Sequence, residues 1–239
     1  MRQIFGKLPW VHGRSHERFR EIFQREGCWV RKKKGETIAN GGLNGEVFWL
    51  ERGLGAYVSP DRRARPHLLA FIPPGRLMGD VDGVTGDTVN MAYTFLRPSE
   101  GWLLERRIFR TYLEADRTLD RAHFLGIIAD HESDMEALFA IATLNLDTRL
   151  RVLTAALTFA DERRPVEALA RAIARDEPLP TPYGLTITEM AMAANATRTA
   201  VSLCLKRWTQ AGWLEIDAAA PTQKRIHPML WANLYDWAL

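Results

Sequence analysis

The sequence predicts an α+β protein with an N-terminal antiparallel β-barrel or jelly roll, a long central helix and a C-terminal winged helix-turn-helix. Short strand-like runs broken by glycine and proline turns extend from Cys28 to about Leu104. Apolar residues at helical spacing continue through 117–144, and two capped helices joined by a tight turn follow at 185–214. The 239 residues, 46% of them hydrophobic, suffice for two domains with buried cores.

The N-terminal region begins with a short helix. Ser15 is its expected N-cap and Gly27 its expected end. Its apolar face has three members, Phe19, Ile22 and Phe23. The strand-like runs that follow are CWVRK, ETIAN, EVFWLERGLGAYVS, HLLAFI, VNMAYTFL and GWLL. The basic run RKKK at 31–34 falls at a strand end and a turn, so a solvated face is favoured over a nucleic-acid patch.

Two helices are expected after the strands, a short one at 105–113 and a long one at 117–144. The apolar stripe of the long helix is broader than a coiled-coil seam needs. Such a helix should contact both its own barrel and a partner chain, so we predict a homodimer. The residues expected in the dimer interface are Leu125, Ile128, Met135 and Phe139.

A helix at 144–160 opens the C-terminal domain, with Asp147 as a suitable cap. Its inward positions are Leu150, Leu153, Ala156 and Leu157. An extra helix led by Pro165 is expected at 164–175, and the segment EPLPTPYG should form a stiff linker after it.

The stretch 185–214 has the local signals of a helix-turn-helix. Thr186 and Glu189 have the spacing of a capping box, and Asn195 tolerates the left-handed conformation that a tight turn needs. Thr197 can cap the second helix and Gly212 can end it. The buried face of the second helix would consist of Val201, Cys204, Leu205 and Trp208. A helical hairpin with a polar outer face is the alternative for this stretch.

The outer face of the second helix suits the reading of a DNA major groove. Arg198 is placed to contact guanine O6 and N7, whereas Lys206 lies further along and should meet phosphate. A wing that pairs 213–217 with 224–227 would add basic residues near the phosphate backbone. The expected DNA-binding residues are Thr197, Arg198, Thr199, Ser202, Lys206, Lys224 and Arg225.

This segment resembles the helix-turn-helix of the Crp/Fnr transcription regulators, and the resemblance covers residues 28–227. KGE at 34–36 resembles the opening turn of that family's effector domain, and WLERG at 49–53 resembles its strand that ends in a turn glycine. IPPG at 72–75, continued to Gly79 and Asp80, resembles the approach to its phosphate-binding cassette. The resemblance implies a cyclic-nucleotide-binding-like domain at 1–116, a dimerisation helix at 117–144 and a DNA-binding domain at 145–239. It further implies a homodimer that binds an inverted-repeat operator in double-stranded DNA, with RNA polymerase as a further partner.

The effector cassette departs from the family's pattern. Gly79 and Asp80 resemble its glycine and acidic residue, and they are the effector-pocket candidates. Cyclic-nucleotide binders of the family have an arginine a few residues later, but the segment VDGVTGDTVNMAY contains neither Arg nor Lys and includes Asp82 and Asp87. Carboxylates repel a phosphate, so we expect that cyclic AMP does not bind. The effector is another ligand or none.

Catalysis and metal binding have no support in the sequence. The six histidines are dispersed, without the pairing that metal-binding cupins use, and no G-x-S-x-G, H-E-x-x-H or P-loop occurs. We expect no catalytic residue, no metal site, no cofactor and no enzyme activity. Without an apolar signal segment or a run that could span a membrane, a cytoplasmic protein without a membrane partner is expected.

Two other function classes stay open. A cupin-type enzyme with an accessory domain is disfavoured by the missing ligand histidines. An effector-sensing or interaction module with a drifted helix-turn-helix is allowed by Leu203, which stands where many relatives have a second polar or basic reader. A redox-sensing role for Cys28, the operator sequence and the sign of regulation are also open.

Overall fold

The computed structural model describes residues 8–38, 45–60, 66–81, 92–216, 224–232 and 234. Its chain divides into two compact units, one of His12–Ser133 and one that combines Met1–Val11 with Asp134–Leu239. The division falls within the long helix α4, Arg117–Thr143.

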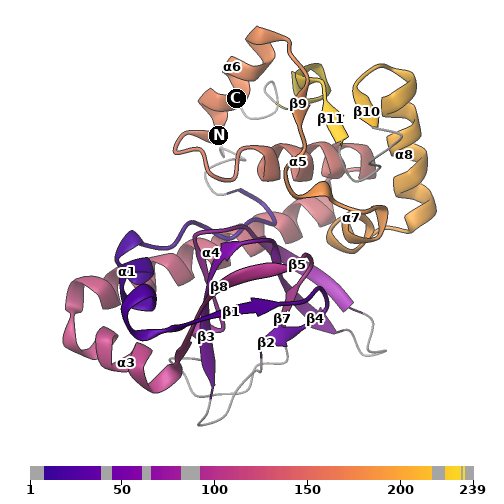
Figure 1. The fold of residues 1–239 in the computed structure, drawn as a ribbon. Helices are drawn as coiled ribbons and strands as arrows, with labels where there is room; N and C mark the ends of the chain where they lie inside the picture. Colours follow the sequence, from indigo (N-terminus) through magenta and orange to yellow (C-terminus); the bar gives the residue numbers. More distant parts are fainter. Residues whose placement is uncertain are drawn as a thin grey trace. The chain divides into compact units, whose positions relative to one another are not determined.

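The first unit is built on two four-stranded antiparallel sheets (Figure 1). In spatial order, one sheet contains β1 (Cys28–Lys32), β8 (Ser99–Glu105), β3 (Glu46–Arg52) and β6 (Arg76–Met78). The other sheet contains β2 (Thr37–Ile38), β7 (Ala92–Phe95), β4 (Gly55–Pro60) and β5 (Pro66–Ile72). The antiparallel pairing confirms the predicted fold class. Strand β6 was not predicted, because three residues are too few to show an alternating pattern.

One hydrophobic core lies between the sheets. Phe48, Leu50 and Met78 of the first sheet pack against residues of the second sheet that include Ile72 and Phe95. Side chains alternate between the faces of a strand, so Val47 and Trp49, the neighbours of Phe48, point to the opposite face of β3 and enter a second core.

Helices α1 (Glu17–Glu26) and α3 (Arg106–Ala115) cover the second core. The predicted apolar face of α1 is confirmed, since Phe19, Ile22 and Phe23 are buried. The N-cap prediction was wrong by one residue. His16 caps α1 by accepting from the Arg18 backbone N–H, whereas the Ser15 hydroxyl accepts from the backbone N–H of Leu77 at 3.1 Å.

Helix α4 starts after Asp116, whose carboxylate accepts from the backbone N–H groups of Thr118 at 2.9 Å and Leu119 at 3.1 Å. It buries Leu119, Ala137 and Ala140. The side chains of its expected dimer stripe are 53% exposed at Leu125, 38% at Ile128, 49% at Met135 and 43% at Phe139.

The second unit consists mainly of helices and a small sheet. Helices α5 (Leu146–Thr158) and α6 (Pro165–Arg175) come first, and then β9 (Leu179–Pro180) and the short 3-10 helix η1 (Pro182–Gly184). Helices α7 (Ile187–Ala193) and α8 (Arg198–Gln210) precede β10 (Leu214–Ile216), β11 (Lys224–Ile226) and η2 (Pro228–Trp231).

The sheet of the second unit has the order β10-β11-β9, so the expected wing pairing is confirmed and a third strand joins it. Strand β9 lies in the segment expected as a linker. It has two residues, one of them a proline, and such strands occur at sheet edges without a sequence pattern. The expected cap of α5 was also wrong, because Asn145 rather than Asp147 accepts from the Thr148 backbone N–H.

Candidate nucleic-acid interface

The helix-turn-helix forms as its local signals predict. The Thr186 hydroxyl accepts from the Glu189 backbone N–H at 3.2 Å, and the Glu189 carboxylate accepts from the Thr186 backbone N–H at 2.8 Å, which completes the capping box. Asn195 in the turn has a φ of 47°. From α5, the Arg149 guanidinium donates to the carbonyl of Ala194 at 2.6 Å and so ties the end of α7 to the rest of the unit.

Helix α8 has one buried face and one exposed face. Thr197 caps it by accepting from the Ala200 backbone N–H at 3.2 Å. Its buried side chains are those predicted, Val201, Cys204, Leu205 and Trp208. The structure brings five of the expected DNA-binding residues together on exposed positions of this helix and its cap, namely Thr197, Arg198, Thr199, Ser202 and Lys206.

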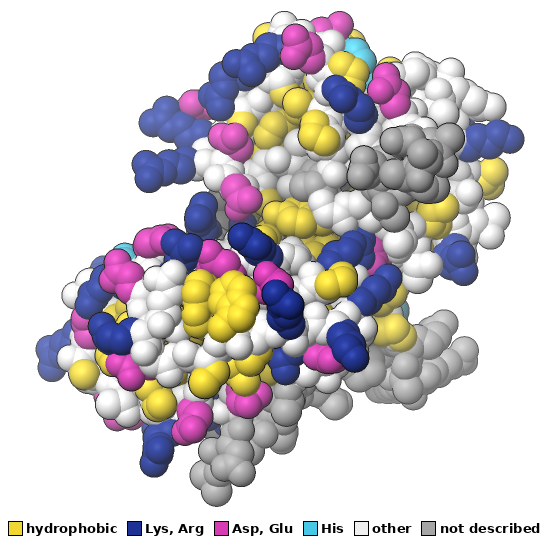
Figure 2. All heavy atoms as spheres, in the orientation of Figure 1, with side chains coloured by type: hydrophobic (Ala, Val, Ile, Leu, Met, Phe, Trp, Pro, Cys, Tyr) yellow, Lys and Arg dark blue, Asp and Glu magenta, His cyan; other side chains and the backbone are white. Residues whose placement is uncertain are grey.

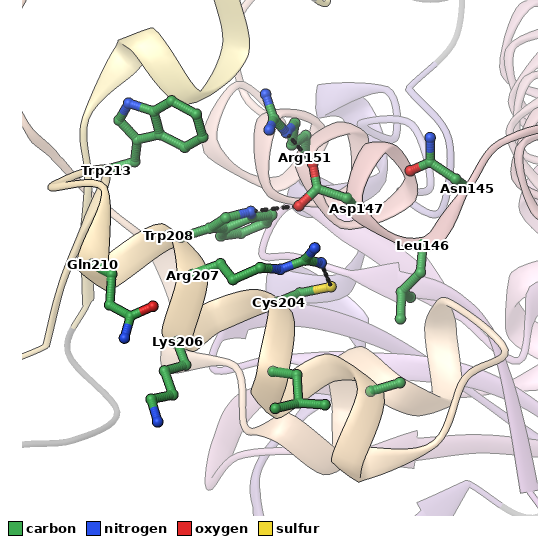
Figure 3. A pocket seen from close by; sticks show the side chains of 12 residues that line it. Asn145, Leu146, Asp147, Arg151, Cys204, Lys206, Arg207, Trp208, Gln210 and Trp213 are labelled. Atoms are coloured by element: carbon green, nitrogen blue, oxygen red, sulfur yellow. Dashed lines mark hydrogen bonds and ion pairs between the residues drawn. The ribbon is translucent and has the colours of Figure 1, made fainter.

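Asp147 of α5 connects the core side of α8 to its neighbours (Figure 3). Its carboxylate accepts from the indole N–H of Trp208 at 2.8 Å and from Nε of Arg151 at 2.7 Å. The Arg151 guanidinium also lies 5.0 Å from the centre of the Trp213 ring, which begins the wing. Sequence reasoning missed this role, because a cap position was the only local signal that Asp147 offers.

An open groove of about 1020 Å³ lies between the start of α5 and the flank of α8 (Figure 3). Leu146 of α5 and Leu203, Lys206 and Arg207 of α8 are among its lining residues. The Arg207 guanidinium donates to Sγ of Cys204 at 3.0 Å, and this contact raises the pKa of Arg207. Arg207 is exposed, and its positive charge lies at this groove.

The wing corrects one of the expected phosphate contacts. The side chain of Lys224 points inward: the residue is 5% exposed, and its ammonium donates to the carbonyl of Leu185 at 2.8 Å. A cation held inside the unit in this way cannot reach a phosphate, so the expectation for Lys224 was wrong. Arg225 lies on the surface and donates to the carbonyl of Pro178 at 3.0 Å.

The effector-pocket candidates, Gly79 and Asp80, are both packed against other residues of the first unit. Gly79 has a φ of 80°, and a Cβ there would lie 2.9 Å from the carbonyl oxygen of Glu46. Asp80 is 9% exposed, and its Oδ2 lies 2.9 Å from Nε2 of His123 in α4, which is 5% exposed. The carboxylate expected to face an effector thus contacts the long helix. Most of the divergent cassette segment, residues 82–91, lies outside the described residues.

The basic run at 31–34 lies on the surface of β1 and the turn after it, as expected of a solvated face. Arg31 and Arg52, whose side chains are 81% and 79% exposed, flank Glu100 at 2.9 and 3.7 Å. Figure 2 shows Lys and Arg side chains around hydrophobic ones in this part of the first unit. One of the exposed hydrophobic residues of β1 is Trp29.

The described residues lack two kinds of feature. Within the described ranges, no group of three or more His, Cys, Asp or Glu side chains is arranged to hold a metal ion. No helix in this part of the chain has the length and apolar character of a membrane span.

Comparisons with known proteins agree on the fold. Neither a family model nor a curated protein sequence matches the chain. The structure of FixK2 from Bradyrhizobium japonicum matches 87% of this chain and 96% of its own length, at 14% identity and a TM-score of 0.67. The c-di-GMP responsive global regulator CLP of Xanthomonas campestris matches 87% of this chain and 97% of its own, at 15% identity and a TM-score of 0.63.

A Crp/Fnr-family transcriptional regulator from Thermus thermophilus covers 83% of this chain and 93% of its own length, at 14% identity and a TM-score of 0.61. The chain therefore has the fold of the Crp/Fnr regulators, and the predicted resemblance is confirmed at the level of the fold.

Proposed function

We propose that the chain is a sequence-specific, double-stranded DNA-binding transcription regulator that works as a homodimer in the cytoplasm. The observation that supports this most is the arrangement of α8. Its core face is formed by Val201, Leu205 and Trp208. On its opposite face, Arg198, Thr199 and Ser202 are exposed in the N-terminal half. In helix-turn-helix proteins this half of the second helix contacts the base edges of the major groove.

Arg198 and Lys206 have different proposed roles. Arg198 is the first residue of α8, and a guanidinium there can donate two parallel hydrogen bonds to guanine O6 and N7. Lys206 lies two turns further along, where the groove curves away, so its ammonium meets a phosphate. The hydroxyls of Thr197, Thr199 and Ser202 fit phosphates and base edges, and Arg225 of the wing adds a phosphate contact.

The proposed dimer uses the exposed stripe of α4. Leu125, Ile128, Met135 and Phe139 follow one another at steps of three, seven and four residues, which keeps them on one side of the helix, and each is more than a third exposed. Several large apolar side chains exposed on one side of a helix are uncommon on the surface of a monomer. A second copy that packs α4 against α4 about a twofold axis would cover them and would place two α8 helices on an inverted repeat, about 34 Å apart.

The proposed regulator does not respond to cyclic AMP. The Asp80 carboxylate lies against His123 rather than in open space, and the segment 81–93 has no cation for a cyclic phosphate. Either another ligand or no ligand acts on the first unit. RNA polymerase is a further proposed partner, through which the DNA-bound dimer would act on transcription.

Binding titrations test the proposal. An operator selected from random DNA should bind the wild-type chain more tightly than unselected DNA. Arg198→Ala should lower operator affinity by about 1–3 kcal/mol per half-site and relax preference at one base position. Lys206→Ala should weaken binding to operator and random DNA alike and reduce the slope against salt by about one unit per contact.

Arg107→Ala is the matched control, since Arg107 of α3 is an 86% exposed cation far along the chain from the reading helix. Its operator affinity should equal that of the wild type. If no sequence were selected over random DNA, the proposed function would be wrong. If Arg198→Ala weakened binding to both DNAs equally, Arg198 would not be a base reader.

A further inference from the structure

The exposed face of α8 includes one large apolar side chain, Leu203. Its exposed fraction is 59%, and among the large hydrophobic residues that the structure describes only Phe124 is more exposed. Leu203 follows Thr199 by one helical turn and precedes Lys206 by three residues, so the three lie on the same outward stripe. Leu203 therefore belongs to the surface that the proposed function assigns to DNA.

The neighbours of Leu203 on this surface argue against a protein docking patch. The residues one turn away on the outward side, Thr199, Lys206 and Arg207, are polar or charged. Leu203 stands beside the cations of Lys206 and Arg207, whose charges attract phosphates, and Leu146 of α5 lines the groove on this flank of α8 with it. Such a surface fits a groove of DNA whose floor has an isolated apolar group.

Thymine provides an isolated apolar group of this kind. In the major groove, A·T pairs present the C5 methyl of thymine, whereas G·C pairs present only hydrogen-bonding groups at their edges. Leucine cannot pair with a donor or an acceptor, and a base edge covered by it loses water without compensation. A leucine that covers a base edge therefore favours a thymine there.

We propose that Leu203 reads one thymine in each half-site through contact with its C5 methyl group. This inference rests on the proposed function and adds a base identity to it. Arg198 and Leu203 are five residues apart, about 7.5 Å along the helix. At about 3.4 Å per base pair, the thymine lies about two base pairs from the guanine that Arg198 contacts.

Replacement of thymine by uracil tests the inference, because it removes only the methyl group. In the selected operator, each thymine is replaced in turn by deoxyuridine, symmetrically in both half-sites, and the affinity of the full-length chain is measured. At one position the wild type should lose about fourfold per half-site, which is the effect of one buried methyl group. Replacement of that thymine by cytosine should weaken binding further, and 5-methylcytosine should recover part of the loss.

Leu203→Ala should bind the thymine operator about as weakly as the wild type binds the uracil operator, and it should no longer distinguish the two. Met229→Ala is the matched control, because Met229 of η2 is 47% exposed and lies outside α8. It should discriminate thymine from uracil as the wild type does. Circular dichroism of both variants checks that they are folded.

The outcomes distinguish a failure of this inference from a failure of the proposed function on which it rests. If the wild type binds its operator specifically but tolerates uracil at every position, or if Leu203→Ala keeps the full thymine preference, the inference is overturned while the proposed function stands. If the wild type prefers no sequence over random DNA, the proposed function is wrong and the role of Leu203 is wrong with it.

Discussion

Substitution of Asp147 tests how the reading helix is held in place. The Asp147 carboxylate accepts from the Trp208 indole at 2.8 Å and from Arg151 at 2.7 Å. Trp208 is 1% exposed, and the side chain of Arg151 is 15% exposed. Asp147→Ala therefore leaves a buried indole N–H and a partly buried guanidinium without this partner.

The expected loss of stability of α8 follows from the strength of these hydrogen bonds. A hydrogen bond to a charged group contributes about 1.5–3 kcal/mol, and the Asp147 side chain is 28% exposed, so water replaces part of what is lost. We expect Asp147→Ala to lower the free energy of opening of α8 by about 2–3 kcal/mol. Asp147→Asn keeps an acceptor for Trp208 but removes the charge, so about half of that loss is expected.

Glu167→Ala is the matched control. Glu167 of α6 also forms an ion pair with an arginine, Arg164, at 3.0 Å. Unlike the pair of Asp147 and Arg151, this one lies on the surface, with the side chain of Glu167 55% exposed and that of Arg164 75% exposed. Such surface pairs contribute about 0–1 kcal/mol. Native-state hydrogen exchange of the α8 amides in the full chain measures the opening free energy directly. If Asp147→Ala changed it no more than Glu167→Ala does, Asp147 would not support the reading helix.

Three further predictions concern the dimer, the start of α4 and the effector. Glu in place of Ile128 and Met135 should convert a dimer into a monomer or an aggregate in sedimentation, and a wild type that is monomeric at micromolar concentration would contradict the dimer. Asp116→Ala should lower the thermal midpoint of unfolding, because this carboxylate caps α4. The hydrogen bond from Arg18 lowers the pKa of Asp116, so its stabilising effect is present at neutral pH and is lost as the pH falls below about 4, where the unfolding curves of variant and wild type should converge. Calorimetry should detect no binding of cyclic AMP at physiological concentrations, since 81–93 has no cation, and micromolar binding would refute this.

Local interactions explain why so much of the helix-turn-helix could be predicted. A cap depends on residues three positions apart, as in Thr186 with Glu189, and the turn at Asn195 depends on that residue's own backbone preference. The buried face of α8 follows from a period of about 3.6 residues. None of these features requires knowledge of what lies across the domain, so the sequence alone determines them.

Contacts between distant parts of the chain could not be predicted from the sequence alone. Lys224 and Arg225 are adjacent basic residues, yet one is buried and the other exposed, because neighbours on a strand point to opposite faces. Which of the two faces inward depends on β9, a strand too short to show in the sequence, and on the Leu185 carbonyl that receives the buried ammonium.

The candidate effector site also has one feature that the sequence shows and one that only the tertiary structure shows. The sequence identifies Asp80 as an acid beside a turn glycine and shows the missing cation after it. Only the tertiary structure brings His123, 43 positions later, to 2.9 Å from the Asp80 carboxylate. Pairing across such a separation is set by how distant elements of the chain pack together, which no local pattern records.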